Sequence, residues 1–302
     1  MKKPEYISCL RPLNTALLVK DLREGKSINL VGHPKAGRER MLDDIQECMT
    51  TVKHIRLNMK NYVGSYDALL ESIADQMGIN YNDKTSLGEL VGAISRESVK
   101  CFILIDNFDA ILDNTELDKK YTRSFFDTLN SLKNKSNISL LCATTKPHEN
   151  SLIYIGGVDN GTSWLQLERE LLQNLNYENI EVELDRQLKD SDLWKNIDTD
   201  RKSMYVNEIY SERHNYDFLC YFTKRFKLQS TKDIKASVSE KIKCWRKEFK
   251  QLQPQQSTVK KLRGIRKYLH QLSIVLRIKD IVKWVPLRSV MDFILEFRNK
   301  KK

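Results

Sequence analysis

The chain has 302 residues, of which 40% are hydrophobic, so it is long enough for a sizeable core and for two or three domains. No apolar run approaches the ~20 residues that span a bilayer, and the basic start lacks an apolar segment, so we expect no signal peptide. The six cysteines are scattered without C-x-x-C spacing, which favours reduced thiols in a cytoplasmic protein over a disulfide framework or a zinc site.

Charge is distributed unevenly along the chain. Residues 201–302 hold 26 Lys and Arg against 9 Asp and Glu, a net charge of +17, whereas residues 1–200 carry −6. Such asymmetry favours a polyanion as the partner of the C-terminal part. The alternative is a solvated basic surface that keeps the protein soluble.

The first predicted elements surround a glycine-bounded loop. A helix at residues 14–24 is expected to be capped by Asn14 and ended by Gly25. A short buried strand at 28–31 leads into the loop at 32–37, and an amphipathic helix continues directly from that loop. Strand, loop and helix in this order are the layout of a phosphate-binding P-loop.

Gly32 and Gly37 have the spacing of the P-loop pattern G-x-x-x-x-G-K-[ST], in which backbone amides at a helix N-terminus surround phosphate oxygens. The lysine of that pattern neutralises phosphate charge and the hydroxyl binds Mg²⁺, but here Arg38 and Glu39 take these places. Arg38 keeps the positive charge in a forked form, Lys35 is a second cation near the phosphates, and Glu39 adds an anion. The alternative is an ordinary turn between a strand and a helix.

Next come a strand and two helices, at residues 54–59, 65–77 and 86–96. The unbroken apolar run at 101–105, typical of a strand buried on both faces, ends at Asp106. This is the Walker B arrangement, whose carboxylate reaches Mg²⁺; the alternative is a capping aspartate after a core strand. Hydrolysing proteins of this class place a glutamate next, whereas this chain has Asn107, whose amide is a far poorer general base.

The next predicted element is a helix at 118–133, with Phe125, Phe126 and Leu129 facing inward. It is followed by a strand at 138–144, a glycine-rich loop at 156–162, a helix at 164–175 and a strand at 180–184. Thr144 ends its strand, where a hydroxyl can sense a γ-phosphate, although threonine is common at strand ends. Five strands alternating with helices predict a parallel sheet covered on both faces. Ligands of such sheets bind at the carboxyl ends of the strands, where Asp106 and Thr144 would join the loop.

Helices dominate from about residue 188, at 203–211, 216–226, 234–252, 258–272 and 286–297. A polar linker at 251–257 and an extended stretch at 274–281 interrupt them. We therefore divide the chain into an α/β P-loop core at 1–185, a helical lid at 186–252 and a basic winged-helix-like domain at 253–302. Trp245 is expected to be a core residue rather than a stacking platform.

The stretches LVKDLREGKSINLVGHPKAGRERML and ILIDNFDAIL resemble the AAA-like P-loop ATPases of the STAND and archaeal-ATPase type. The resemblance implies a five-stranded nucleotide-binding core, a helical lid and a winged helix, with ATP or ADP and Mg²⁺ as cofactors. Departures at Arg38, Glu39 and Asn107 look like a site retired from hydrolysis. Members of the family often serve as switch or scaffold subunits in anti-phage defence, which is the setting that the resemblance implies.

Two functional hypotheses follow for the core: a non-hydrolysing subunit that assembles with a partner protein or with itself, or an active ATPase whose site a partner completes. The candidate nucleotide site comprises Gly32, Lys35, Gly37, Arg38, Glu39, Asp106, Asn107 and Thr144, with Asp106 as the Mg²⁺ ligand. A third hypothesis places DNA or RNA on the basic C-terminal part. The residues expected to contact phosphates there are Lys260, Lys261, Arg263, Arg266 and Lys267.

Overall fold

The computed structural model describes residues 6, 9–33, 35–82, 85–212, 215–229 and 238–252. By its contacts the chain divides into two units, 1–245 and 246–302, and only residues 246–252 of the second are described. Residues 253–257 of the predicted linker, the winged-helix-like domain and the basic residues Lys260–Lys267 therefore lie outside the described residues, whereas residues 251 and 252 are helical. Within them, no helix is long and apolar enough to cross a bilayer.

Five parallel strands form the central sheet, as the sequence predicts. Their order is β2 (Lys53–Asn58), β3 (Cys101–Asp106), β4 (Ile138–Thr144), β1 (Ser27–Val31) and β7 (Glu168–Leu171). Every residue of β1, β3 and β4 is buried, which explains why these strands are mostly apolar. The register pairs Asn58 with Asp106 and Val31 with Thr144, so these residues share the carboxyl edge.

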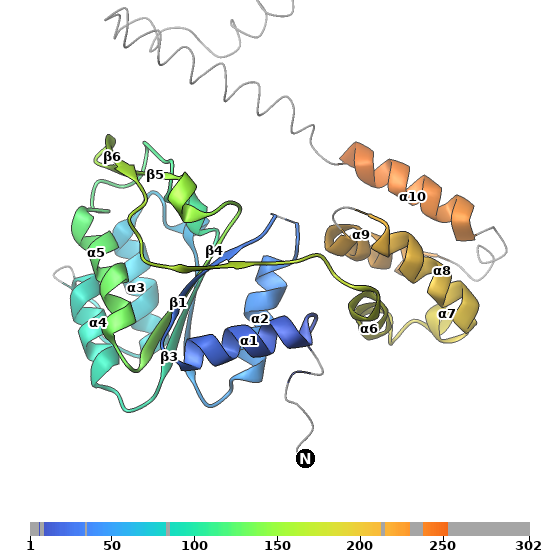
Figure 1. The fold of residues 1–302 in the computed structure, drawn as a ribbon, viewed down its shortest axis with the longest axis horizontal. Helices are drawn as coiled ribbons and strands as arrows, with labels where there is room; N and C mark the ends of the chain where they lie inside the picture. Colours follow the sequence, from blue (N-terminus) through green and yellow to red (C-terminus); the bar gives the residue numbers. More distant parts are fainter. Residues whose placement is uncertain are drawn as a thin grey trace, which may run out of the picture. The chain divides into compact units, whose positions relative to one another are not determined.

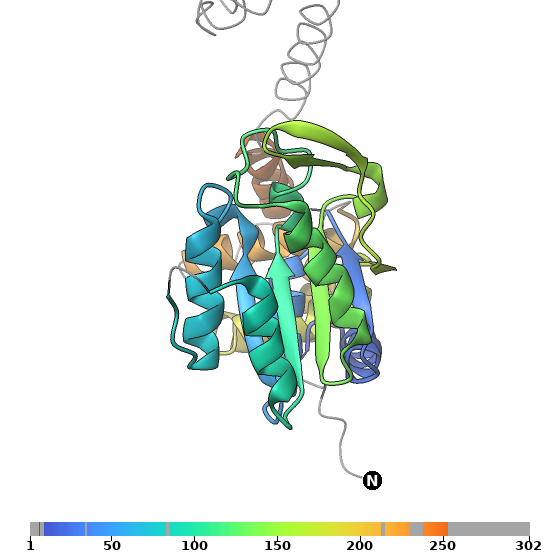
Figure 2. The ribbon, with the colours of Figure 1, turned by 90° about the vertical axis from the view of Figure 1, so that its left-hand side faces the viewer.

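Helices cover both faces of this sheet (Figures 1 and 2). The helices α3 (Tyr66–Met77), α4 (Leu87–Arg96) and α5 (Arg123–Ser131) cover one face, and α1 (Pro12–Arg23) and α2 (Arg38–Cys48) cover the other. Alternate residues of β3 serve the two layers: Ile103 and Ile105 belong to the core under α3–α5, whereas Phe102 and Leu104 belong to the core under α1 and α2.

Local capping explains most of the helix boundaries. Ser65 accepts a hydrogen bond from the Ala68 N–H at the start of α3, and Gly78 in the left-handed region ends that helix. The prediction of Asn14 as a cap was wrong, because Pro12 already occupies the first turn and Arg11 precedes it. The helix predicted from residue 118 begins at Arg123, because Asp118 instead accepts the backbone N–H groups of Tyr66 and Lys120.

The prediction of the fifth strand was wrong. Residues 168–171 form β7 where a helix was expected, and α6 (Tyr177–Gln187) occupies the stretch expected to be a strand. The open edge of β1 accepts β7, and Asn176 caps α6, whose Ile180 and Leu184 are buried one turn apart. The glycine-rich loop at 156–162 forms part of a hairpin of β5 (Leu152–Ile155) and β6 (Val158–Thr162).

Beyond the sheet, the described residues up to 252 form mainly helices, as predicted. We call α6 to α9 the helical bundle; its further members are α7 (Asp192–Lys195), α8 (Thr199–Tyr210) and α9 (Asn215–Lys227), and α10 (Val238–Leu252) follows it. Contacts of α6 with α8 and α9 tie the bundle together. Trp245 is buried with its ring 5.4 Å from that of Phe222, so its prediction as a core residue is confirmed.

Candidate functional site

A cleft of about 390 Å³ lies at the carboxyl edge of the sheet. It is formed by the loop at 32–37, the start of α2, the end of β3 and the start of α9. Its lining residues are Lys35, Gly37, Arg38, Glu39, Arg40, Asp43, Lys60, Asp106, Asn107, Tyr216, Asp217 and Cys220. The structure therefore brings Lys35, Gly37, Arg38, Glu39, Asp106 and Asn107 of the predicted site into one cleft.

The backbone conformation requires glycine at position 37, whereas Gly32 is packed closely against side chains. Gly37 has φ of +84° and precedes α2, and a Cβ there would lie 2.8 Å from the ring of Tyr216. A Cβ on Gly32 would lie 3.0 Å from the Leu172 side chain, and the Gly32 N–H already donates to the Thr144 carbonyl at 2.9 Å. The loop thus joins a strand to a helix in the order of a P-loop, with Gly32 continuing the sheet and Gly37 preceding the helix.

Arg38, which replaces the P-loop lysine, is buried with only 5% of its surface exposed. Its Nη2 donates to Asn107 Oδ1 at 3.1 Å. Its Nε lies 4.0 Å from Asp106 Oδ1, and its Nη1 lies 4.0 Å from Asp109 Oδ1. The guanidinium is therefore turned toward the carboxylates that follow β3.

Asp106 and Asn107 form a closed hydrogen-bonded unit. The Asn107 backbone N–H donates to Asp106 Oδ1 at 2.8 Å, and its amide Nδ2 donates to Asp106 Oδ2 at 3.0 Å. The same Nδ2 donates to Asn58 Oδ1 at 3.1 Å. Asn107 adopts φ of +50°, a left-handed conformation that asparagine tolerates better than most residues. Its amide is thus occupied by Arg38, Asp106 and Asn58.

These residues do not fit a Mg²⁺ ion. Mg²⁺ requires near-ideal octahedral coordination by oxygens, and the P-loop hydroxyl that would supply one is replaced by Glu39, whose side chain is exposed. Both carboxylate oxygens of Asp106 already accept hydrogen bonds, and the buried guanidinium of Arg38 lies beside this carboxylate. Among the described residues, no group of three or more His, Cys, Asp or Glu is arranged to hold a metal ion.

The helical bundle contributes residues that the sequence analysis missed. Lys35 Nζ lies 3.0 Å from Asp217 Oδ2, and the Tyr216 ring covers Gly37. The side chain of Asn215 exchanges two hydrogen bonds with the Leu175 backbone, at 2.7 and 3.1 Å, and so fixes the start of α9. Burial raises the pKa of Tyr216, so its phenol stays protonated at neutral pH. No motif marks these residues, because only the tertiary structure brings α9 to the loop.

A second set of missed residues supports the loop from behind. Arg11 Nη2 donates to the Ala36 carbonyl at 2.7 Å, and its Nε donates to the Gln173 carbonyl at 3.0 Å. Burial lowers the pKa of Arg11 to about 10, which still leaves it charged at neutral pH. Asp44 of α2 accepts the Leu10 N–H at 2.9 Å, and burial raises the pKa of this carboxyl to about 6. The segment before α1 therefore holds both the loop and the helix that follows it.

Thr144, the last predicted site residue, does not line the cleft. It is fully buried, and its hydroxyl donates to the Lys146 carbonyl at 2.7 Å. The same oxygen accepts a hydrogen bond from Asn29 Nδ2 at 2.8 Å. Asn29 also accepts the His148 N–H at 3.1 Å, so it links β1 to the segment after β4. The hydroxyl of Thr144 is therefore part of a structural network.

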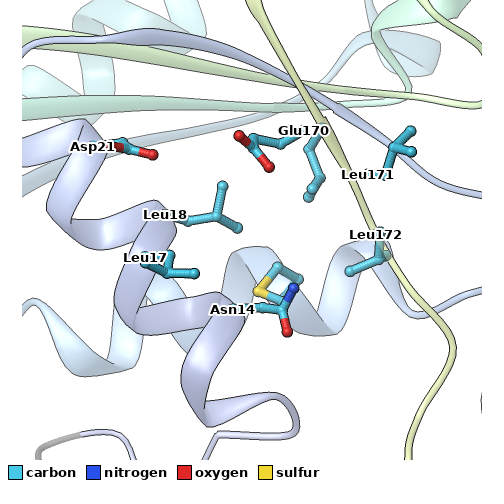
Figure 3. A pocket seen from close by; sticks show the side chains of 9 residues that line it. Asn14, Leu17, Leu18, Asp21, Glu170, Leu171 and Leu172 are labelled. Carbon is cyan, nitrogen blue, oxygen red and sulfur yellow. The ribbon is translucent and has the colours of Figure 1, made fainter.

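A smaller cavity of about 160 Å³ lies between α1 and the edge strand β7 (Figure 3). Leucines dominate its lining, together with Asn14, Asp21 and Glu170. Leu17 and Leu171 there are 63% and 59% exposed. None of the predicted site residues lines this cavity, so it is separate from the cleft beside Arg38.

Comparison with known proteins identifies the fold. No protein-family model and no curated protein matches the sequence. Domain III of the Thermotoga maritima replication initiation protein DnaA is similar in structure, with a TM-score of 0.51 and 14% identity, covering 80% of this chain and 91% of that domain. Cdc6p from Pyrobaculum aerophilum has a TM-score of 0.48 and 14% identity over 71% of this chain, which spans 60% of the Cdc6p chain.

PCH-2 of C. elegans has a TM-score of 0.46 and 10% identity, with 80% of this chain and 68% of that chain covered. At these identities the comparisons concern the fold alone. The match to DnaA domain III supports the α/β fold described above, which has five parallel strands and helices on both faces of the sheet. The chain has an AAA+-like α/β fold.

Proposed function

We propose that this chain is a non-hydrolysing subunit with an AAA+-like core, in which the cleft binds a nucleotide and the core assembles with a partner protein or with further copies of itself. The observation that carries the proposal is the position of Arg38, buried against Asp106 and Asp109 and hydrogen-bonded to Asn107. In an ATPase of this fold class, the position of Arg38 holds a phosphate-binding lysine, that of Asp106 a metal-binding carboxylate and that of Asn107 a residue that polarises water.

The chemistry of the cleft supports binding more than turnover. The amide of Asn107 cannot accept a proton from water at neutral pH, and its hydrogen-bonding groups are already used. The lining cations are Lys35, Arg38, Arg40 and Lys60, and the lining carboxylates are Glu39, Asp43, Asp106 and Asp217. Because the two sets balance, a highly charged triphosphate gains little from the net charge of the cleft and is expected to bind modestly.

ATP turnover by the purified full chain tests this proposal. We expect no phosphate release above a protein-free blank, and the same result for Asp106→Asn, which keeps the shape of the side chain. The opposite outcome is turnover well above the blank that is abolished in a folded Asp106→Asn variant. That result would support an active ATPase in which these residues are arranged differently. Nucleotide binding is measured separately by thermal unfolding, since a ligand at 100 times its Kd adds about 2.7 kcal/mol to the free energy of unfolding.

The charge of the C-terminal part supports a second candidate function, the binding of DNA or RNA through phosphates. Residues 201–302 carry a net charge of +17. Reversal of Lys260, Arg263 and Lys267 to Glu is expected to weaken duplex binding and to flatten its salt dependence, because each phosphate contact contributes about −0.9 to the slope of log K against log salt. The assay is fluorescence anisotropy of a labelled duplex at salt concentrations from about 50 to about 200 mM, a range over which affinity that depends on phosphate contacts falls strongly.

A matched control reverses three exposed lysines of the first unit, Lys20, Lys120 and Lys195, and so changes the net charge by the same amount. If both triple variants weaken binding equally, overall charge rather than a C-terminal site is responsible. If the wild type does not bind at low salt, the basic segment serves solubility or protein docking.

A further inference from the structure

We infer that the cleft takes the phosphate group of its nucleotide as the metal-free anion, with the guanidinium of Arg38 in place of Mg²⁺. The inference rests on the proposed nucleotide-binding function and adds the ionic form of the ligand. Nucleotide sites of the P-loop type bind phosphates through a lysine, backbone amides and a Mg²⁺ ion that bridges phosphate oxygens to the protein. In this cleft, the side chains that would bind the Mg²⁺ ion are not available in their usual places.

The first argument concerns the carboxylate of Asp106. Both of its oxygens accept hydrogen bonds from Asn107, at 2.8 and 3.0 Å. A hydrated Mg²⁺ ion approaching this carboxylate would meet the buried guanidinium of Arg38, whose Nε lies 4.0 Å from Asp106 Oδ1. Repulsion between a dication and a guanidinium is poorly screened where the side chain is 5% exposed. The cation that the carboxylates accept is therefore Arg38 itself.

The second argument concerns unused donors. Among the described residues, neither Nε nor Nη1 of Arg38 finds a hydrogen-bond acceptor, although both atoms are buried. A guanidinium carries N–H donors and no acceptor, so only an acceptor from another group can satisfy these atoms. A buried donor without an acceptor is costly, and a phosphate oxygen at the cleft would supply one. Arg38 lines the cleft together with Lys60 and with Lys35, whose Nζ lies 3.0 Å from Asp217 Oδ2.

The third argument concerns the position after Arg38. A hydroxyl there would be the second protein ligand to Mg²⁺, but Glu39 is exposed at the start of α2. A carboxylate on a long exposed side chain does not hold an octahedral ion beside the loop. The loop and the cations are therefore suited to a phosphate, while the metal ligands are absent from their usual places.

The experiment titrates ATP into the full chain by isothermal calorimetry, once with EDTA and once with excess MgCl₂ at equal ionic strength. Because Mg²⁺ converts free ATP into a complex of lower charge, we expect binding at least threefold weaker with Mg²⁺. Equal or tighter binding with Mg²⁺ would overturn the inference and leave the proposed nucleotide site intact. An absence of binding in both buffers would overturn the nucleotide site itself. ADP and pyrophosphate, titrated in the same way, tell whether the base or the phosphates supply the affinity.

Two variants assign the effect to Arg38. The double change Arg38→Lys with Glu39→Ser restores the lysine and hydroxyl of the P-loop pattern, and we expect Mg²⁺ to strengthen its ATP binding. Glu39→Ser alone changes an exposed residue and keeps Arg38, so Mg²⁺ should still weaken binding, and this variant decides the question if the double variant does not fold. Strengthening of ATP binding by Mg²⁺ in Glu39→Ser alone would show that Arg38 does not replace the metal.

Discussion

Replacing Asp106 by alanine is expected to lower the free energy of unfolding by about 3–5 kcal/mol, even without any ligand. The change leaves the buried guanidinium of Arg38 with Asp109 as its remaining carboxylate, at 4.0 Å from Nη1. It also removes the acceptor of two Asn107 hydrogen bonds. In a working ATPase, an equivalent carboxylate serves a metal ion, so its loss would affect turnover more than folding.

Urea unfolding followed by circular dichroism measures this effect. The matched control is Asp127→Ala, which removes an exposed carboxylate that lies 3.7 Å from Arg123 and is expected to cost under about 1 kcal/mol. Removing both charges, by Arg38→Met with Asp106→Leu, is expected to recover part of the loss, because the guanidinium is no longer buried without its partner. A loss below about 1 kcal/mol in Asp106→Ala would contradict the view that Arg38 and Asp106 act as a buried pair.

Replacing Phe126 by alanine is expected to lower the free energy of unfolding by about 3–5 kcal/mol. Phe126 is fully buried on the inner face of α5, and its ring meets those of Phe125 and Trp164 edge to face, at centroid distances of 5.1 and 5.8 Å. Alanine would leave a cavity between α5 and the sheet, and both ring contacts would be lost. The same unfolding measurement applies.

The control for Phe126 is Leu171→Ala on β7, which shortens a side chain that is 59% exposed. We expect its effect to remain within about 0.5 kcal/mol, as is usual for surface substitutions. Similar losses in the two variants would mean that the helices over this face of the sheet contribute less to stability than their burial indicates.

Much of the fold could be predicted from local patterns in the sequence. The run at 101–105 is apolar throughout and those at 28–31 and 138–144 are mostly apolar, a pattern typical of strands buried on both faces. Helices α3 and α4 carry their own caps at Ser65 and Ser86. Because parallel strands present their carboxyl ends at one edge, the sequence also determined that the loop and Asp106 would lie near each other.

Local patterns failed where a segment's structure depends on a distant partner. Residues 168–171 have an exposed, charged sequence that resembles a helix, yet they pair with the open edge of β1. Residues 180–184 alternate like a strand, yet Ile180 and Leu184 are buried against the bundle one turn apart. For residues 168–171 the distant strand β1 supplies the backbone hydrogen-bonding partner, whereas for residues 180–184 the burial of Ile180 and Leu184 on one face of α6 accompanies the helix.

The features of the candidate site likewise fall into those that the sequence determined and those that the tertiary structure decided. The sequence by itself determined the glycine spacing, the aspartate after β3 and the loss of the usual lysine, hydroxyl and glutamate. Only the tertiary structure decided what the replacements do: Asn107 turns left-handed onto Asp106, Arg38 fills the space between the carboxylates, and Tyr216 covers Gly37. The physical reason is that motifs record residue types along one chain segment, whereas hydrogen bonds and charge pairs in a buried site depend on positions set by several segments at once.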